Sequence, residues 1–259
     1  MQCDFNTLIS QPHSLIAGAT GSGKSNLLHN IIDTILNYPQ CILCLIDPKR
    51  VELSLYKNYG NAQIYACDND DIITALDAIL ETMTDRYNIM EENTLREYNG
   101  AHCFLIIDEL ADLMTTSKKA VLPRLQRILQ LGRAARIHVI AATQAPDRTY
   151  TLPAPLKLNF TDRIALRCAT SIESKQIIDA KGAENLPQYG KAIYRDCIGN
   201  LNVVDIPYIP TEKILARVQE ARQKYKFLYL PMLMQDKPLY KRLYPEDFNC
   251  LGLLKRKAV

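Results

Sequence analysis

The sequence contains, between residues 18 and 25, the run Gly18-Ala19-Thr20-Gly21-Ser22-Gly23-Lys24-Ser25. This run matches the phosphate-loop pattern of Gly, four residues and Gly-Lys-Ser/Thr at every required position. The apolar stretch 14–17 before it is typical of a buried parallel strand, and the apolar residues of 26–36 after it recur at helical spacing. The run is therefore expected at a strand-to-helix turn, as a phosphate loop requires.

The residue types in this turn suit a nucleoside triphosphate. Gly21 and Gly23 can adopt backbone conformations closed to other residues, so that successive N–H groups converge on phosphates at the positive end of the next helix. Lys24 would reach the β- and γ-phosphates, and the Ser25 hydroxyl would bind Mg²⁺. A glycine-rich turn that binds nothing is the alternative. We expect ATP to be held by Gly18, Ala19, Thr20, Gly21, Ser22, Gly23, Lys24, Ser25 and Asn26.

A second chemical signature closes the apolar strand expected at 103–107, where Asp108 and Glu109 follow. In phosphate-loop ATPases the acid at such a strand end holds Mg²⁺, and a following Glu can polarise the attacking water. We therefore expect Asp108 to serve the metal and Glu109 to act as the base, the alternative being a polar strand end without chemistry. The strand expected at 137–143 should lie beside this one, and Gln144 at its end would sense the γ-phosphate.

The rest of the chain alternates strand and helix patterns. Strands are expected at 41–46, 62–67, 162–168, 191–195 and 202–206, and helices at 70–92, 118–136, 171–181 and 211–226. This alternation predicts an α/β fold, a mainly parallel sheet with helices on both faces. We expect one ATPase domain over residues 1–226 and an extended basic arm over residues 227–259, which prolines interrupt.

The composition is that of an ordinary globular protein, with 259 residues, 47% of them hydrophobic and 23% charged. No apolar run approaches the roughly 18 residues that span a bilayer, and the first residues lack the features of a signal peptide, so the cytoplasm is the expected compartment. From residue 211 onward, eleven Lys/Arg face five Asp/Glu. This surplus suits contact with nucleic acid, and it suits a solvated helix and tail equally well.

Several stretches in one order resemble the motor domain of the FtsK/SpoIIIE family of double-stranded DNA translocases. They include the loop 18–25, Asp47-Pro48-Lys49-Arg50, Asp108-Glu109-Leu110-Ala111-Asp112, Gly132-Arg133-Ala134-Ala135, Ala142-Thr143-Gln144, Arg163-Ile164-Ala165-Leu166-Arg167 and Gly182-Ala183-Glu184. The resemblance extends over residues 10–195. A phosphate loop alone is generic, but this combination of stretches is specific.

The resemblance implies a RecA-like phosphate-loop fold that assembles as a ring, usually a homo-hexamer, around double-stranded DNA. ATP would bind at subunit interfaces, with Mg²⁺ as the metal. Arg133 matches the arginine finger that reaches into the neighbour's site, and Arg163 is the alternative for that role. Gln144 matches the sensor glutamine, and the residues of 47–50 match a motif that supports the active site or the interface.

The expected function is that of a DNA translocase or pump driven by Mg²⁺-ATP, for conjugative transfer or for handling phage or plasmid DNA. An ATPase that engages a protein substrate, as in a specialised secretion system, or that acts as an assembly switch, is the alternative. Few residues precede the first strand and the C-terminal arm is short for a winged-helix module, so a minimal motor is expected. Arg136 stands where the family usually has Gly, which would alter the turn into the next strand.

Overall fold

A single mixed sheet forms the centre of the protein in the computed structural model, which describes residues 10–38, 41–57, 63–144 and 153–225. The strand order is β3-β2-β4-β5-β1-β6-β7-β8. The strands are β1 (His13–Ala17), β2 (Cys41–Ile46), β3 (Gln63–Ala66), β4 (His102–Ile107), β5 (Ile137–Thr143), β6 (Asp162–Ala165), β7 (Lys191–Arg195) and β8 (Leu201–Asp205). Strands β1 to β6 are parallel, and β7 and β8 are antiparallel. The prediction of a mainly parallel α/β sheet is confirmed.

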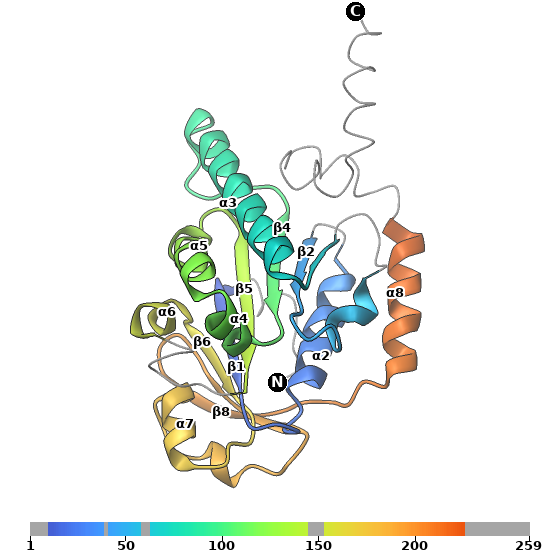
Figure 1. Cartoon of the computed structure of the whole chain (residues 1–259), viewed down its shortest axis with the longest axis vertical. Helices are drawn as coiled ribbons and strands as arrows, with labels where there is room; N and C mark the ends of the chain where they lie inside the picture. The colour runs from blue at the N-terminus through green and yellow to red at the C-terminus, as the bar shows by residue number, and fades with distance from the viewer. Residues whose placement is uncertain (1–9, 39–40, 58–62, 145–152, 226–259) are drawn as a thin grey trace, which may run out of the picture.

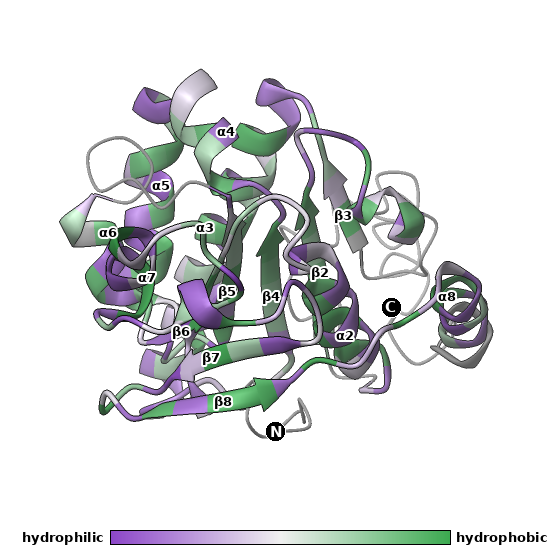
Figure 2. Cartoon of the chain, turned by 90° about the horizontal axis from the view of Figure 1, so that it is seen from below, coloured by the Kyte–Doolittle hydropathy of each residue, from purple (hydrophilic) through white to green (hydrophobic). Residues whose placement is uncertain are grey.

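Helices cover both faces of this sheet. Helices α2 (Lys24–Leu36) and α8 (Thr211–Tyr225) lie on one side, and α3 (Asn69–Glu92) and α5 (Lys118–Leu131) lie on the other (Figure 1). Because both faces are covered, the inner strands read as continuous apolar runs, and every residue of β2 and of β5 is buried. Figure 2 shows these strands as a hydrophobic centre.

The register brings three strand ends to one edge of the sheet. Ile107 of β4 lies opposite Ala141 of β5, and Ala17 of β1 lies opposite Thr143 of β5. Because the strands are parallel, the segments that follow them start side by side at their carboxyl ends, which is where ligands bind in open α/β sheets. The expected neighbourhood of the strands that carry Asp108 and Gln144 is confirmed.

The structure differs from the predicted elements in several places. The helix expected over 118–136 ends at Leu131, because residues 132–136 form a tight turn into β5. Helices α4 (Leu110–Thr116) and α6 (Ala154–Asn159) were not predicted, since six or seven residues are too few to show a helical period. Strand β6 and helix α7 (Ser171–Ile178) end about three residues earlier than expected.

No helix in the described ranges is long and apolar enough to cross a membrane. The arm predicted for residues 227–259 lies outside the described residues.

Candidate nucleotide-binding site

The phosphate loop lies between β1, at the centre of the sheet, and the first residue of α2. Gly21 and Gly23 have φ angles of 71° and 96°, in the left-handed region that favours glycine. At Gly18, an added Cβ would lie 2.8 Å from the Ser22 Oγ and 2.9 Å from the Leu166 Cβ. The loop is therefore wound tightly over the end of β1, with its backbone as its lining.

Lys24 folds its side chain back into this loop. Its Nζ donates hydrogen bonds to the carbonyl oxygens of Gly18 at 2.8 Å and Ala19 at 2.9 Å. Burial lowers the pKa of Lys24, and the nearby carboxylates of Glu109 and Asp108 partly offset that effect. The loop thus keeps a buried cation at the position where phosphate oxygens would converge.

A cavity of about 730 Å³ opens over the loop, within the usual range for small-molecule sites. Its lining includes the loop itself, Asp108 and Gln144, and also Tyr189 and Tyr208. The side chain of Asn26 fixes the segment around Tyr208, because its amide donates to the Pro207 carbonyl at 2.8 Å and its oxygen accepts from the Ile209 backbone N–H at 2.9 Å. The cavity therefore offers a ligand both polar groups and aromatic rings.

The sequence did not identify Tyr189 and Tyr208 as residues of this cavity. Tyr189 precedes β7 and Tyr208 follows β8, so both lie more than 160 residues away from the phosphate loop along the chain. They are largely exposed, at 63% and 79%. An exposed tyrosine in a connecting segment has no local pattern that marks it as a site residue.

Asp108 lines the cavity and has several other carboxylates near it. Burial raises its pKa to about 6, and the charges of Asp47, Glu52 and Glu109 add to that rise. Oxygen ligands of this kind are those that Mg²⁺ prefers, and a divalent cation would relieve the repulsion between them. Ser25 lines the same cavity and adds a hydroxyl. The residues present therefore fit a magnesium ion held by Ser25 and Asp108.

Glu109 is 2% exposed, and three hydrogen bonds fix its carboxylate. Oε1 accepts from the backbone N–H of Gln144 at 3.1 Å and of Ala111 at 3.3 Å, which caps α4, while Oε2 accepts from the Lys49 amine at 3.3 Å. Lys49 and Gln144 line the cavity, and Glu109 lies behind them. The expected base is thus adjacent to the site, one side chain away from its wall.

Gln144 connects two parts of the site. Its Oε1 accepts a 2.8 Å hydrogen bond from the Thr20 hydroxyl of the phosphate loop, and its backbone N–H is the donor to Glu109. Gln144 therefore links the phosphate loop to Glu109, through its side chain on one side and its backbone on the other.

The stretch 47–50, whose role the sequence left open, follows β2 at the same edge. Asp47 is buried, and its Oδ2 accepts from the Leu53 backbone N–H at 3.0 Å and the Tyr65 hydroxyl at 3.3 Å. Arg50 has a positive φ and pairs with Asp68, just before α3. The stretch therefore shapes the loop that presents Lys49 to Glu109.

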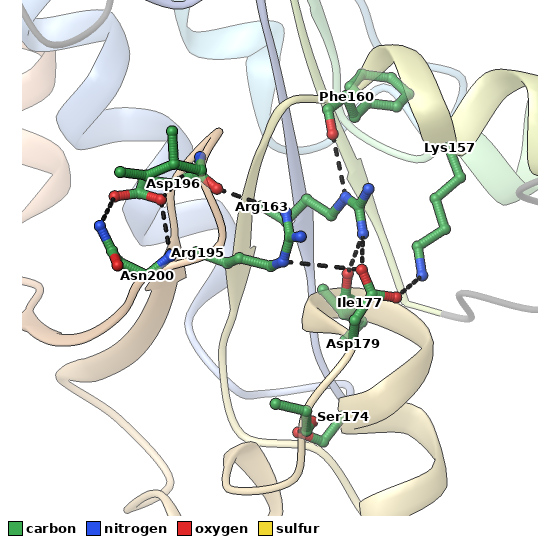
Figure 3. A network of polar contacts seen from close by, with 11 residues as sticks. Lys157, Phe160, Arg163, Ser174, Ile177, Asp179, Arg195, Asp196 and Asn200 are labelled. Atoms are coloured by element: carbon green, nitrogen blue, oxygen red, sulfur yellow. Dashed lines mark hydrogen bonds and ion pairs between the residues drawn. The ribbon is translucent and has the colours of Figure 1, made fainter.

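The two arginines considered for the finger role have opposite environments. Arg133 is exposed in the turn before β5, at the sheet edge opposite the phosphate loop, and its side chain has no hydrogen bond or ion pair within the described part of the chain. Arg163 is 7% exposed and donates to the Phe160 carbonyl at 3.0 Å and to Asp179 at 2.6 Å. Figure 3 shows Arg163 and Arg195 converging on Asp179 inside the chain.

A phosphate loop at the end of a central parallel strand, with the adjacent carboxylates of the partly buried Asp108 and the buried Glu109 at the end of the second strand along, defines a phosphate-loop ATPase. The model of the FtsK/SpoIIIE family matches residues 2–104. The DNA translocase FtsK of Chlorobaculum tepidum is 34% identical over 232 residues, which cover 80% of this chain and 29% of that protein. The chain belongs to the FtsK/SpoIIIE family, and it spans less than a third of that relative.

Two solved structures share the fold. The pCW3 conjugation coupling protein TcpA, in its monomer form with ATPγS, superposes with a TM-score of 0.74 at 24% identity, over 83% of this chain and 66% of that one. The cytoplasmic domain of the type VII secretion ATPase EccC of Thermomonospora curvata superposes with a TM-score of 0.67 at 19% identity, over 81% of this chain and 28% of that one. These likenesses concern the fold.

Proposed function

We propose that this chain is a motor subunit that moves double-stranded DNA as a ring, driven by Mg²⁺-ATP hydrolysis. The observation that carries the proposal is the nucleotide site of the phosphate loop, Asp108, Glu109 and Gln144, in a chain whose relatives at 34% and 32% identity are named DNA translocases. One solved neighbour is titled a cytoplasmic domain, and the cytoplasm is the compartment that we propose.

In this proposal each residue of the site has a separate task. The loop amides and Lys24 hold the phosphates, which requires the Lys24 amine to leave the carbonyls of Gly18 and Ala19. Ser25 and Asp108 would hold Mg²⁺, which supplies positive charge to the phosphate oxygens when it is bound. Gln144 senses the γ-phosphate from the position that it shares with Thr20.

Glu109 is the proposed base, and its contacts indicate which oxygen would meet the water. The carboxylate has about four acceptor sites and Oε1 already accepts from two backbone N–H groups, so Oε2, which accepts from Lys49, is the oxygen proposed to receive the attacking water. Lys49 is the donor to that oxygen. We infer that the Lys49 contact keeps Oε2 in place when ATP is bound.

Arg133 is the proposed arginine finger, acting on the ATP of the neighbouring subunit. Its place at the opposite edge of the sheet prevents it from serving the site of its own chain, and its exposed side chain suits contact with a neighbour. Arg163 is held by Phe160 and Asp179, which argues against it as the finger. A site completed by the next subunit requires a closed ring, and a hexamer is the ring that we propose.

Mixing variants tests the shared site. Arg133→Ala subunits keep a complete phosphate loop and Glu109→Gln subunits keep the arginine, so an interface between them in the right order contains one complete site. We expect ATP turnover in mixed assemblies to exceed that of either variant alone. Mixtures that stay as inactive as the separate variants would contradict a site formed by two subunits.

The polymer substrate is tested by ATP turnover with linear duplex DNA, with single-stranded DNA and without DNA. A motor that contacts the phosphate backbone should be stimulated by duplexes of any sequence, and the stimulation should weaken steeply as salt rises, since binding releases counterions. A polypeptide substrate is the second candidate, because the fold is also that of the type VII secretion ATPase EccC. With such a substrate, no form of DNA would change the rate of ATP turnover.

A further inference from the structure

The turn that carries Arg133, residues 132–136, accepts hydrogen bonds on its backbone carbonyls from a side chain of α3. Arg86, on α3, donates from Nη1 to the carbonyl oxygen of Ala135 at 2.6 Å and to that of Arg136 at 3.3 Å. The Arg86 side chain is fully buried, at 0% exposure, although its charge is one that proteins seldom bury. A guanidinium on these two carbonyls fixes the far end of the turn.

Two tyrosines add further contacts to Arg86 and to the turn. The Arg86 guanidinium lies over the Tyr98 ring, 4.5 Å from its centroid, and the Tyr98 backbone N–H donates to the Ala134 carbonyl at 2.8 Å. The Tyr87 hydroxyl, also on α3, donates to the carbonyl of Leu131 at 2.9 Å, immediately before the turn. The stacked ring holds the guanidinium flat, so that its hydrogen bonds keep their direction.

The turn itself is closed by a backbone hydrogen bond. The Arg136 N–H bonds the Arg133 carbonyl at 3.1 Å, and Arg136 adopts a φ of 53°, in the left-handed region where the family's usual Gly would be relaxed. Unlike Gly, Arg136 has a side chain that forms hydrogen bonds. Its guanidinium donates to the Glu97 carboxylate at 3.0 Å and to the Gly100 carbonyl at 3.2 Å. The only long side chain left pointing into solvent from residues 132–136 is that of Arg133.

The energetics indicate what Arg86 contributes. A buried charge carries a desolvation cost that an apolar side chain of similar volume, filling the same space between α3 and the sheet, would avoid. What an apolar side chain could not provide is the pair of hydrogen bonds to Ala135 and Arg136. The buried charge is therefore best explained by what it holds in place, which is the turn.

We propose that Arg86, stacked on Tyr98, is a positioning residue for Arg133, holding the turn in the geometry from which Arg133 reaches the neighbouring subunit's ATP. This inference rests on the shared site proposed above. A charged donor stabilises a developing charge without reorganisation only when its scaffold is rigid. A displacement of about 1 Å in such a group can cost about 100-fold in rate.

The first measurement compares Arg86→Met with Arg86→Lys in the full chain. Arg86→Met removes both hydrogen bonds while filling the space, and we expect turnover to fall by about 100-fold with ATP affinity within about twofold of wild type. Arg86→Lys keeps the charge and a hydrogen-bonding nitrogen but has no planar group for the Tyr98 ring, so we expect an intermediate loss. Arg124→Gln is the matched control, because it removes an α3–α5 ion pair, to Asp77, away from the turn, and it should leave turnover unchanged.

The decisive measurement mixes Arg86→Met subunits with Lys24→Ala subunits. The Arg86→Met subunit keeps its own phosphate loop, and the Lys24→Ala subunit supplies an intact Arg133, so turnover in the mixture should exceed that of both separate variants, as it should for Arg133→Ala with Lys24→Ala. General damage to the subunit would give no recovery and would overturn the inference. If Arg86→Met does not fold, Arg86→Lys carries the same test.

The two proposals fail in different ways. Normal turnover in Arg133→Ala would overturn the shared site, and the role of Arg86 with it. An inactive Arg133→Ala that recovers in mixtures, beside an Arg86→Met that turns ATP over at the wild-type rate, would overturn the positioning role of Arg86 alone. A loss of ATP affinity in Arg86→Met equal to its loss of turnover would also overturn it.

Discussion

Lys49 lies 3.3 Å from Glu109, amine nitrogen to carboxylate oxygen, and 3.6 Å from Asp112, which makes it the cation that holds the proposed base. Burial lowers the pKa of Lys49, but the charges of Glu109 and Asp112 outweigh that effect, and the net pKa is raised. The amine therefore stays protonated at neutral pH. Glu109, the proposed base, is thus bound to a lysine that itself lines the cavity over the phosphate loop.

Replacing Lys49 should slow hydrolysis more than it weakens binding. In Lys49→Ala the carboxylate of Glu109 loses the contact that fixes one of its oxygens, so we expect turnover to fall by about tenfold while ATP affinity changes by less than about threefold. Steady-state turnover and titration with a fluorescent ATP analogue measure the two quantities. Lys57→Ala is the control, since Lys57 is an exposed lysine that follows the same loop. Equal losses in both variants would contradict a specific role for Lys49.

Lys24→Ala should abolish productive ATP binding. The lysine is a buried amine within the loop, and a charge-assisted hydrogen bond to a phosphate contributes about 1.5–3 kcal/mol, so affinity should fall by at least about tenfold. Equilibrium titration of the variant against wild type gives the ratio. Unchanged affinity would show that the loop holds its ligand without the lysine.

Glu109→Gln should bind ATP and fail to hydrolyse it. The amide keeps the size of the side chain and can still accept from the backbone N–H groups of Gln144 and Ala111, but it cannot take a proton. We expect turnover to fall by about 100-fold or more with affinity retained, as for removal of a general base. Hydrolysis at the normal rate would mean that another group is the base.

Gly132→Ala should destabilise the turn that carries Arg133. The added Cβ would lie 2.7 Å from the Ile128 carbonyl oxygen and 2.8 Å from that of Ile137, both of which belong to the backbone and cannot rotate away. We expect a loss of about 1–3 kcal/mol in the free energy of unfolding, together with slower turnover. Urea unfolding measures the first effect. A variant as stable as wild type would show that the turn can relax without cost.

Asp162, at the start of β6, should make stability depend on pH. Burial raises its pKa to about 6, a rise that the Tyr194 hydroxyl partly offsets and the charge of Asp196 augments. Because the folded chain binds this proton more tightly than the unfolded chain, the resulting stabilisation is complete below the ordinary pKa and is lost as pH rises through about 6. Asp162→Asn cannot titrate, so it should lack this contribution.

The measurement for Asp162 is urea unfolding at about pH 5 and about pH 7.5. Wild type should gain about 1 kcal/mol more than Asp162→Asn when the pH is lowered between these values. Equal changes in the two proteins would show that the carboxyl has no raised pKa in the folded state.

Much of the nucleotide site could be read from local sequence. The glycines of the phosphate loop, Lys24 and the adjacent Asp108 and Glu109 are recognisable because a tight turn and a buried strand end each need particular residue types within a few positions. The succession of strands and longer helices along the chain could also be predicted, from the period at which apolar residues recur. Short helices such as α4 and α6 have too few residues to show a period.

The sequence by itself thus determined that a phosphate loop and a carboxylate pair lie on an α/β sheet of the FtsK/SpoIIIE family. The tertiary structure alone decided that Glu109 pairs with Lys49, that Tyr208 lines the same cavity as the phosphate loop, and that Arg86 binds the turn of Arg133 at the opposite sheet edge. The reason is that such contacts join residues dozens of positions apart. They depend on strand order and on the direction of each side chain, which a local pattern of apolar and polar residues leaves undetermined.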